Sequence, residues 1–403
     1  MVKKIIALSI ALVLMLAAPL YDVITAPPAS PVDFGAGDGT SLVIESPEKL
    51  NELLSNIPSI ETYLQTEDMT TVNQSFKSFT MTEDGFSKQT ETYKTSSEIN
   101  EIETYTQHVL EMCFAVDALY YHAVGQTRVT NSLYNKNSDG ERSGFKSAER
   151  TTTDFDMEIY YSKSKVLLKI NDLEYLEEEK LDDLSDYTKV LADEEEAFSP
   201  SAQMSFLKKC KGKWLELKEY TEEELASKLG IDLTNPDSMT EDAQIAYVAY
   251  MYSNEFAKAN IESINQSNQM NVAYLAKLGS YIVENLSSSF TESSGNLYYL
   301  NNDSEAKNNY ANAIVGSSVF GENNNADIEA EFNVGSTEST IYQQWELEVG
   351  SREIEMETTT TFKNLDNTVV NLKDQKITTV YDALKGAITD YLKEMSKEDA
   401  NNG

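Results

Sequence analysis

Residues 326–363, ADIEAEFNVGSTESTIYQQWELEVGSREIEMETTTTFK, decide the fold class. Apolar side chains alternate with polar ones in three successive runs, Ile328–Val334, Ile341–Val349 and Ile354–Phe362. This period of two is typical of a strand that has one face on a core and the other in water. Because only short Gly-Ser turns separate the runs, they predict a three-stranded antiparallel meander.

Earlier segments carry the same signal with varying clarity. Alternation at Phe155–Tyr161 and at Val166–Ile170 predicts two strands joined by a short turn, and Leu215 and Leu217 alternate in a third. Residues 66–100 are rich in Thr, Ser, Lys and Glu, which predicts exposed strands or a loop. Residues 102–123 fit a helical stripe and a strand equally well, so periodicity leaves that segment open.

Helices interrupt the predicted sheet. Thr221-Glu222-Glu223-Glu224 reads as a capping box, and Ser238 with Glu241 reads as a second one. Apolar stripes predict one helix after each box, another over residues 275–286 and a last one from about 378 to 393. Runs of strands and helices without strict alternation indicate an α+β fold.

Charge and missing motifs restrict the function. The 32 Lys and Arg against 67 Asp and Glu give a net charge of −35, which argues against nucleic-acid binding. His108 and His122 are the only histidines, and we expect both to be ordinary surface or half-buried residues. With no nucleophile elbow, zinc motif or phosphate-binding loop, we expect a non-enzymatic protein without cofactor or metal. The Asn-rich segments 301–305 and 323–327 read as polar turns rather than calcium loops.

The N-terminal residues predict export. Two lysines and an apolar run make residues 1–26 a signal peptide or an uncleaved anchor, and residues 27–45 form a Pro/Gly-rich tether. Residues 46–395 then form the folded domain, with a helical insertion over about 221–290, before a disordered tail at 396–403. We therefore expect the protein to be secreted or to lie on the outer face of the cytoplasmic membrane.

Two cysteines occur in the chain. In an exported protein Cys113 and Cys210 could pair as one disulfide closing a loop of about a hundred residues. Alternatively, both are buried free thiols.

The order of strands resembles a known family. A Thr-rich strand at Asp154–Tyr161 continues into Lys165–Asp172, and a Gly-Lys-Trp strand at Gly212–Leu217 leads into a short capped helix before the final meander. This is similar to the LolA/LppX-type lipoprotein-carrier superfamily and its Gram-positive exported relatives. The resemblance implies a curved antiparallel β-sheet, or half-barrel, with helices packed on one face and acyl chains held between the two layers. The chain departs from the family in lacking a lipobox cysteine and in its acidic helical insertion.

The resemblance implies a ligand site on the sheet face that the helices cover. Alternating positions of the predicted strands would line it: Phe155, Met157, Ile159, Phe332, Trp345, Leu347, Ile354 and Met356. The alternative is that these residues simply form a filled core. The function expected is then either a protein that holds a lipid or amphiphile at the cell surface, or an envelope scaffold or adhesin-like module with an exposed apolar patch.

A lysine cluster precedes the Gly-Lys-Trp strand. Lys208, Lys209, Lys211 and Lys213 could dock a membrane surface against the acidic background, with Trp214 at the interface. The alternative is a charged hairpin turn.

Overall fold

The computed structural model describes residues 44–57, 79–114, 118–162, 165–190, 210–229, 240–293, 295–315, 325–364, 372, 375–386 and 388–389. The predicted signal or anchor, most of the tether, and the tail lie outside these residues.

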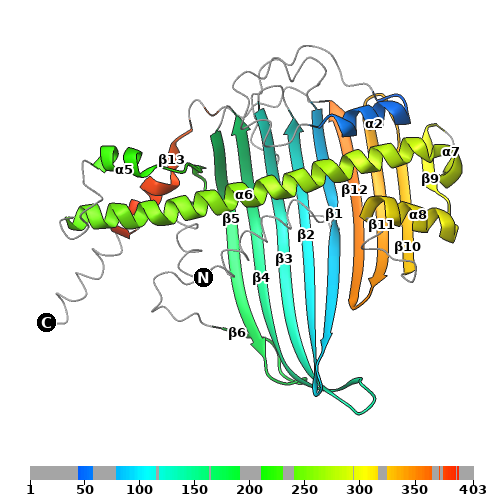
Figure 1. The fold of residues 1–403 in the computed structure, drawn as a ribbon, viewed down its shortest axis with the longest axis horizontal. Coiled ribbons are helices and arrows are strands. Elements are labelled where there is room, and N and C mark those ends of the chain that lie inside the picture. Colours follow the sequence, from blue (N-terminus) through cyan, green and yellow to red (C-terminus); the bar gives the residue numbers. More distant parts are fainter. Residues whose placement is uncertain are drawn as a thin grey trace.

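One large open sheet dominates the structure (Figure 1). It has 13 strands, in the order β13-β7-β5-β4-β3-β2-β1-β12-β11-β10-β9-β8, with β6 paired to β5. The pairing of β13 with β7 is parallel, and the other strand pairings among the described residues are antiparallel. The strands are β1 Phe79–Lys94, β2 Glu98–Phe114, β3 Ala118–Lys136, β4 Arg142–Ser162, β5 Lys165–Lys180, β6 Thr188–Lys189, β7 Trp214–Glu216, β8 Phe290–Glu292, β9 Leu297–Leu300, β10 Asn325–Asn333, β11 Glu338–Val349, β12 Arg352–Asn364 and β13 Ile377–Thr379. The α+β class and the mostly antiparallel sheet are thus confirmed.

The predicted meander is present as β10, β11 and β12. The ambiguous segment 102–123 is strand throughout its described residues, in β2 and β3. The segment expected to be exposed contains β1, which pairs with both β2 and β12 in the middle of the sheet. The first strand along the chain therefore joins the C-terminal meander to the long hairpins β2–β5.

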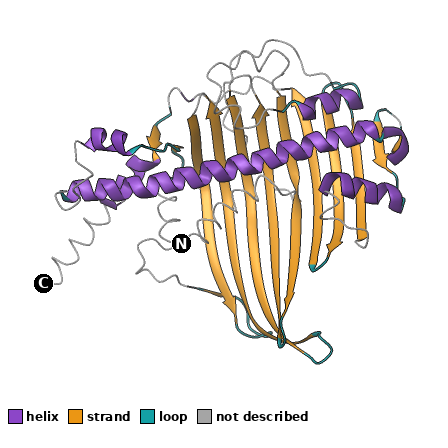
Figure 2. Cartoon of the chain, in the orientation of Figure 1, coloured by secondary structure: helices purple, strands orange, loops and turns teal. Residues whose placement is uncertain are grey.

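Helices cover one face of the sheet (Figure 2). The helices are α2 Pro47–Ser55, α5 Glu222–Leu229, α6 Glu241–Glu284, α7 Leu286–Ser289 and α8 Ser304–Val315. Of these, α5 lies beyond the edge of the sheet, beside the N-terminal part of α6 (Figure 1). Figure 1 shows α6 crossing the strands from beyond β5 to β10, with α2 and α8 beside its C-terminal half. The core lies between these helices and the sheet, and α6 supplies Leu275, Leu278 and Ile282 to it.

The long helix α6 corrects the prediction of two separate helices. No Pro or Gly occurs between Glu241 and Lys277, so nothing in that stretch ends the helix. Its N-cap is Thr240, whose Oγ1 accepts a hydrogen bond from the Ala243 backbone N–H at 3.3 Å, in place of the predicted Ser238, which lies outside the described residues.

The other helix ends follow the sequence more closely. In the predicted capping box, Thr221 Oγ1 accepts from the Glu224 N–H at 3.1 Å, and the Thr221 N–H donates to Glu224 Oε2 at 3.0 Å. The Asn-rich segment 301–305 forms the start of α8, where Asp303 Oδ1 accepts from the Ala306 N–H at 2.8 Å. The last helix begins at residue 380 rather than 378, because residues 377–379 form β13.

The two cysteines are both free and buried. Cys210 belongs to the main core, whereas Cys113 packs with Tyr120, Leu167 and Trp214 in a separate cluster. The structure therefore has the buried-thiol alternative and not the disulfide. Burial raises the pKa of Cys113 to about 12, so its thiol stays protonated near neutral pH.

Candidate functional site

The eight predicted ligand-lining residues all belong to the main core, on the sheet face that α6 covers. Those on β4, β10 and β11 are buried, and Ile354 and Met356 on β12 are half-buried. The structure brings them into two groups, one on β4 and one on β10–β12, separated by β3, β2 and β1. Between the two groups, the same face of the sheet carries buried polar side chains.

Polar side chains replace apolar ones at the centre of this face. Thr106 on β2 pairs in register with Thr127 on β3, which pairs with Thr153 on β4. His108 lies two positions further along β2, on the same face as Leu110. All four are buried, with His108 only 1% exposed, which corrects the expectation of an ordinary surface or half-buried histidine.

Most of these polar groups have no hydrogen-bond partner. The unpaired atoms are Oγ1 of Thr106, Oγ1 of Thr127 and Nδ1 of His108, whereas His108 Nε2 makes no hydrogen bond but faces the Glu83 carboxylate at 3.5 Å. Buried polar side chains in proteins are nearly always hydrogen-bonded to protein or to ordered water, and an unpaired one costs roughly 1–3 kcal/mol. Several unpaired groups on two adjacent strands therefore call for a common explanation.

Helix α6 brings a matching group from the other side. Tyr274 of α6 lies over β11, because its OH accepts a hydrogen bond from Gln343 Nε2 at 2.6 Å. Strand β2 lies three strands from β11, toward the N-terminal end of α6. Because a helix advances about 1.5 Å per residue and strands lie roughly 4.8 Å apart, the residue of α6 above β2 should precede Tyr274 by about nine or ten positions. This spacing points to Asn265, whose Oδ1 is buried without a hydrogen-bond partner. We call Thr106, His108, Thr127 and Asn265 the polar patch.

Glu83 supplies the formal charge beside the patch. Its Oε1 lies 3.5 Å from His108 Nε2, and its side chain is 19% exposed. Burial raises the pKa of Tyr274, and the negative charge of Glu83 adds to that effect, which places Glu83 on the helix side of the sheet. The Tyr310 OH of α8 donates to Gln343 Oε1 at 2.7 Å, so Gln343 is held from both helices.

A glycine makes room for His108. Gly125 pairs in register with His108, and a Cβ at this position would lie 2.0 Å from the Gln107 carbonyl oxygen and 2.5 Å from the His108 Cα. Only glycine allows so close an approach of β2 and β3.

A second polar group, the charged cluster, lies on the opposite face of the sheet. Glu158 accepts from the Tyr120 OH at 3.0 Å and from Lys169 Nζ at 2.7 Å, while His122 Nε2 lies 2.9 Å from Asp156 Oδ1. The cluster consists of Tyr120, His122, Asp156, Glu158, Lys169 and Asn171. In contrast to the polar patch, its charges are paired, so the geometry favours a structural role.

A β-bulge completes the charged cluster. The register between β4 and β5 shifts between Asp156 and Met157, which leaves Asn171 as the extra residue of β5. Its side-chain amide donates to Asp156 Oδ1 at 3.0 Å and to Glu158 Oε1 at 2.7 Å. Bulges change the direction in which a side chain points, and this bulge lets the Asn171 amide donate to the carboxylates of both Asp156 and Glu158.

The pH dependence of stability should report on the charged cluster. Burial alone would lower the pKa of His122, but the hydrogen bond and charge of Asp156 outweigh it and raise that pKa. Burial acts to raise the pKa of Asp156, yet its bonds to His122 and Asn171 leave it lowered. A raised histidine pKa stabilises the fold below about pH 6.5 and loses this effect as the pH rises; a lowered aspartate pKa stabilises it above about pH 4 and loses this effect in acid.

We therefore expect the free energy of unfolding of wild type to exceed that of His122→Gln most strongly between about pH 4 and 6.5. The difference should be about 1–2 kcal/mol there, as expected for a charge-assisted hydrogen bond, and should shrink as the pH rises through the raised pKa. Urea titrations from pH 4 to 9 measure it. A difference that grows above pH 7 would contradict the assignment of a charged His122.

The described residues among those predicted to dock on a membrane do not form one exposed group. Lys208 and Lys209 lie outside the described residues, and Lys213 is exposed. Lys211 Nζ lies 2.6 Å from Asp172 Oδ1. Trp214 is only 2% exposed and packs in the sheet with Lys169 5.6 Å from its ring, so it does not lie at an interface. Strand β7 buries Trp214 and Leu215 on opposite faces, which explains the error.

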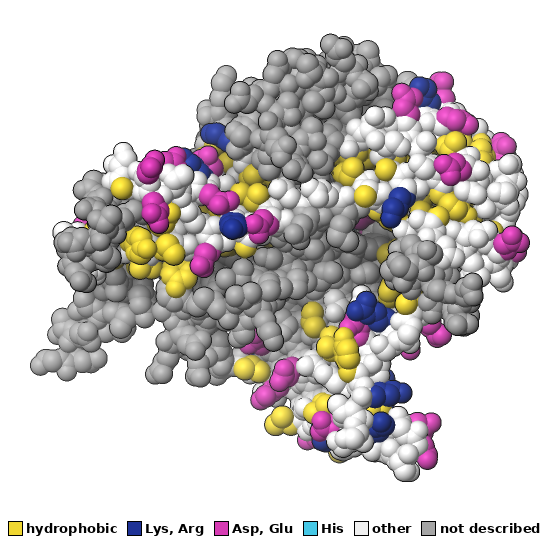
Figure 3. Space-filling model, viewed as in Figure 1, with side chains coloured by type: hydrophobic (Ala, Val, Ile, Leu, Met, Phe, Trp, Pro, Cys, Tyr) yellow, Lys and Arg dark blue, Asp and Glu magenta, His cyan; other side chains and the backbone are white. Residues whose placement is uncertain are grey.

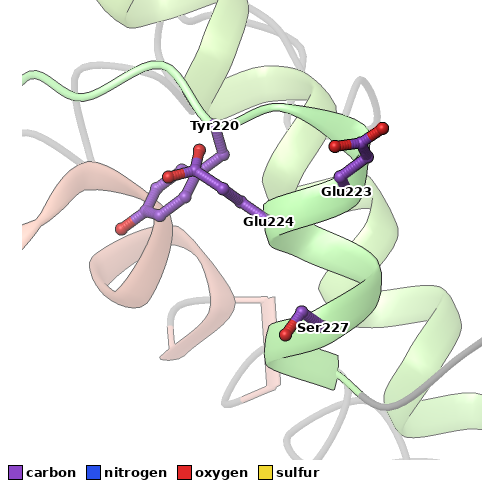
Figure 4. Close-up of a pocket in the computed structure, with 4 residues that line it drawn as sticks. All are labelled: Tyr220, Glu223, Glu224 and Ser227. Atoms are coloured by element: carbon purple, nitrogen blue, oxygen red, sulfur yellow. The ribbon is translucent and has the colours of Figure 1, made fainter.

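Two hollows occur elsewhere in the described part of the chain. One, of about 490 Å³, is open and lies at the start of α5, where Tyr220, Glu223, Glu224 and Ser227 line it (Figure 4). The other, of about 250 Å³, lies where β9 ends beside β10 and includes Lys307, whose ammonium bonds Asp327. Neither is lined by the eight predicted residues or by the polar patch.

Sequence reasoning missed the polar patch, although a signal was available. Thr106 and His108 continue the alternation that leads to Leu110 and Met112, and their polarity departs from it. Within the described residues, no His, Cys, Asp and Glu side chains group as a metal site, and no helix is long and apolar enough to cross a membrane. Comparisons with protein-family models, curated proteins and solved structures found no match.

Proposed function

We propose that this protein is a non-enzymatic, exported binding protein that holds an amphiphile between α6 and the sheet. The large open sheet with helices along one face fits the half-barrel arrangement that the sequence resemblance implies. The protein would then act at the cell surface, presenting or storing the bound molecule.

The observation that carries this proposal is the polar patch. Unpaired groups of Thr106, His108 and Thr127 lie on two adjacent strands of a mainly apolar core, and the helix spacing of α6 points to the unpaired Oδ1 of Asn265 above them. A polar group of a ligand would satisfy them together, as water does in other buried sites. Leu110 on β2 and Met157 on β4 adjoin the patch on the same face and suit an apolar chain.

Native mass spectrometry after gentle extraction from the producing cells tests the proposal. We expect a mass above that of the polypeptide, and solvent extraction should release an amphiphile. In the double variant Thr106→Val/Thr127→Val the added mass should be lost or reduced at least tenfold, because valine keeps the shape but removes the hydroxyls. The matched control is Thr130→Val, on β3 but on the opposite face, which should retain the ligand.

The opposite outcome is equally specific. If the hydroxyls are merely buried, wild type should carry no added mass, and the double valine variant should be more stable by about 1–2 kcal/mol. That result would reject amphiphile binding at the patch.

One observation favours the alternative of an interaction module. Tyr247, Val248 and Met251 are exposed on α6, at 36%, 37% and 42%. Figure 3 shows hydrophobic side chains gathered near the end of α6 that projects beyond the sheet. If these exposed apolar residues of α6 form the functional surface, the double variant Tyr247→Ser/Met251→Ser should abolish the association of the protein with the cell surface. The mass of any bound ligand should remain unchanged in that variant.

A further inference from the structure

The charges around the polar patch restrict the ligand that it can hold. From Met81 to Gln89 on β1, and at the positions opposite on β2, β3 and β4, the residues that face α6 include no Lys or Arg. On α6, the Lys258 side chain is 61% exposed and Lys277 is also exposed. No cation of the described residues near the patch is therefore available to neutralise an anionic group.

Among the described residues, the formal charge beside the patch is the negative one of Glu83. The Glu83 carboxylate lies 3.5 Å from His108, and it would repel a phosphate or carboxylate placed over Thr106. The His108 imidazole offers no free cationic partner to such a group, because its Nε2 already faces the Glu83 carboxylate at 3.5 Å. Burying an anion without a paired cation costs far more than burying a neutral group.

The patch instead offers sites for a donor. Asn265 Oδ1 and the Glu83 carboxylate accept hydrogen bonds, and the hydroxyls of Thr106 and Thr127 both donate and accept. A ligand hydroxyl or amine can satisfy such a set, whereas an anionic group, which only accepts, leaves Asn265 Oδ1 without a donor.

We infer that the amphiphile bound at the polar patch has a head group without negative charge that donates hydrogen bonds, such as a hydroxyl or an amine. The same chemistry disfavours phospholipids and fatty acids, whose head groups carry a negative charge. This inference rests on the proposed function, since it names the class of ligand for that site.

A competition among three amphiphiles with the same acyl chain tests the inference. Delipidated full-length protein is incubated with equal amounts of a monoacylglycerol, the corresponding fatty acid and the corresponding lysophosphatidic acid. The bound fraction is then quantified by native mass spectrometry at neutral pH. We expect the monoacylglycerol to be retained at least tenfold over either anion.

Two variants assign the discrimination to Glu83. Glu83→Gln removes the negative charge and should narrow the preference against the fatty acid at least threefold. Asp84→Asn is the matched control: the next residue on β1, on the opposite face, should leave the preference unchanged.

The outcomes separate the two claims. Equal or stronger binding of an anion by wild type would overturn the inference and leave amphiphile binding intact. Retention of none of the three would count against the proposed function itself, and the inference would fall with it.

Discussion

Replacing Gly125 by valine should leave little folded protein. A Cβ at this position would come within 2.0 Å of the Gln107 carbonyl oxygen, 2.5 Å of the His108 Cα and 2.8 Å of its Cβ. Two of these atoms are backbone in the centre of the sheet, so they can move only if the β2–β3 ladder separates. A separation of this kind disrupts the long hairpins on which the core is built.

The expected loss is more than about 4 kcal/mol, which is a large part of the 5–15 kcal/mol typical of a folded domain. Soluble yield, circular dichroism and urea denaturation measure it. Gly386→Ala is the control: nothing lies within 4 Å of its added Cβ, and alanine in a helix gains up to about 1 kcal/mol over glycine. A Gly125→Val variant as stable as wild type would show that β2 and β3 do not approach closely at His108.

The second large effect is expected at Lys169. Its side chain is 15% exposed, and its ammonium lies 2.7 Å from Oε1 of Glu158, whose side chain is 4% exposed. Replacing Lys169 by methionine leaves a buried carboxylate with only the neutral donors Tyr120 and Asn171. Breaking a buried pair from one side costs about 3–5 kcal/mol.

The double variant Glu158→Gln/Lys169→Met should recover most of that loss, because no unpaired charge then remains. The matched control is Lys211→Met: this lysine pairs with Asp172 at the surface, where both side chains are more than half exposed, and it should cost about 0–1 kcal/mol. Urea denaturation of the four proteins at pH 7 gives the comparison. Equal losses for Lys169→Met and Lys211→Met would contradict the buried charge pair.

The sequence predicted the elements in which one face meets water. Strands β10–β12 alternate cleanly because their outer positions carry glutamates, so the meander was visible from residues 326–363 alone. Strand β3 is buried on both faces from Ala118 to Ala123, which gives a nearly continuous apolar run and erases the alternation. That is why residues 102–123 could not be assigned.

The length of helix α6 could not be predicted from its apolar residues. Residues 260–271, NIESINQSNQMN, are mostly polar, so no apolar stripe links the two predicted helices. The helix continues through them because nothing breaks it and because both ends pack against other elements. This polar middle segment contains Asn265, the residue that α6 contributes to the polar patch.

The candidate site depends on register and could not be derived from spacing. Glu83, Thr106 and Thr127 come from three strands, and only the pairing of β1, β2 and β3 places them on one face beneath α6. Alternation predicted that the eight apolar residues face a core, and all eight lie in or against the main core, while their role in lining a ligand site stays a prediction. What alternation could not show was the polar row between them.

A crystal structure of the protein purified gently from its producing cells tests the central claim most directly. We expect continuous density between α6 and the sheet that is not polypeptide, with a polar end within hydrogen-bond distance of Thr106, Thr127 and Asn265. Density showing these three side chains bonded only to one another, to other protein groups or to isolated waters, within a filled core, would contradict it.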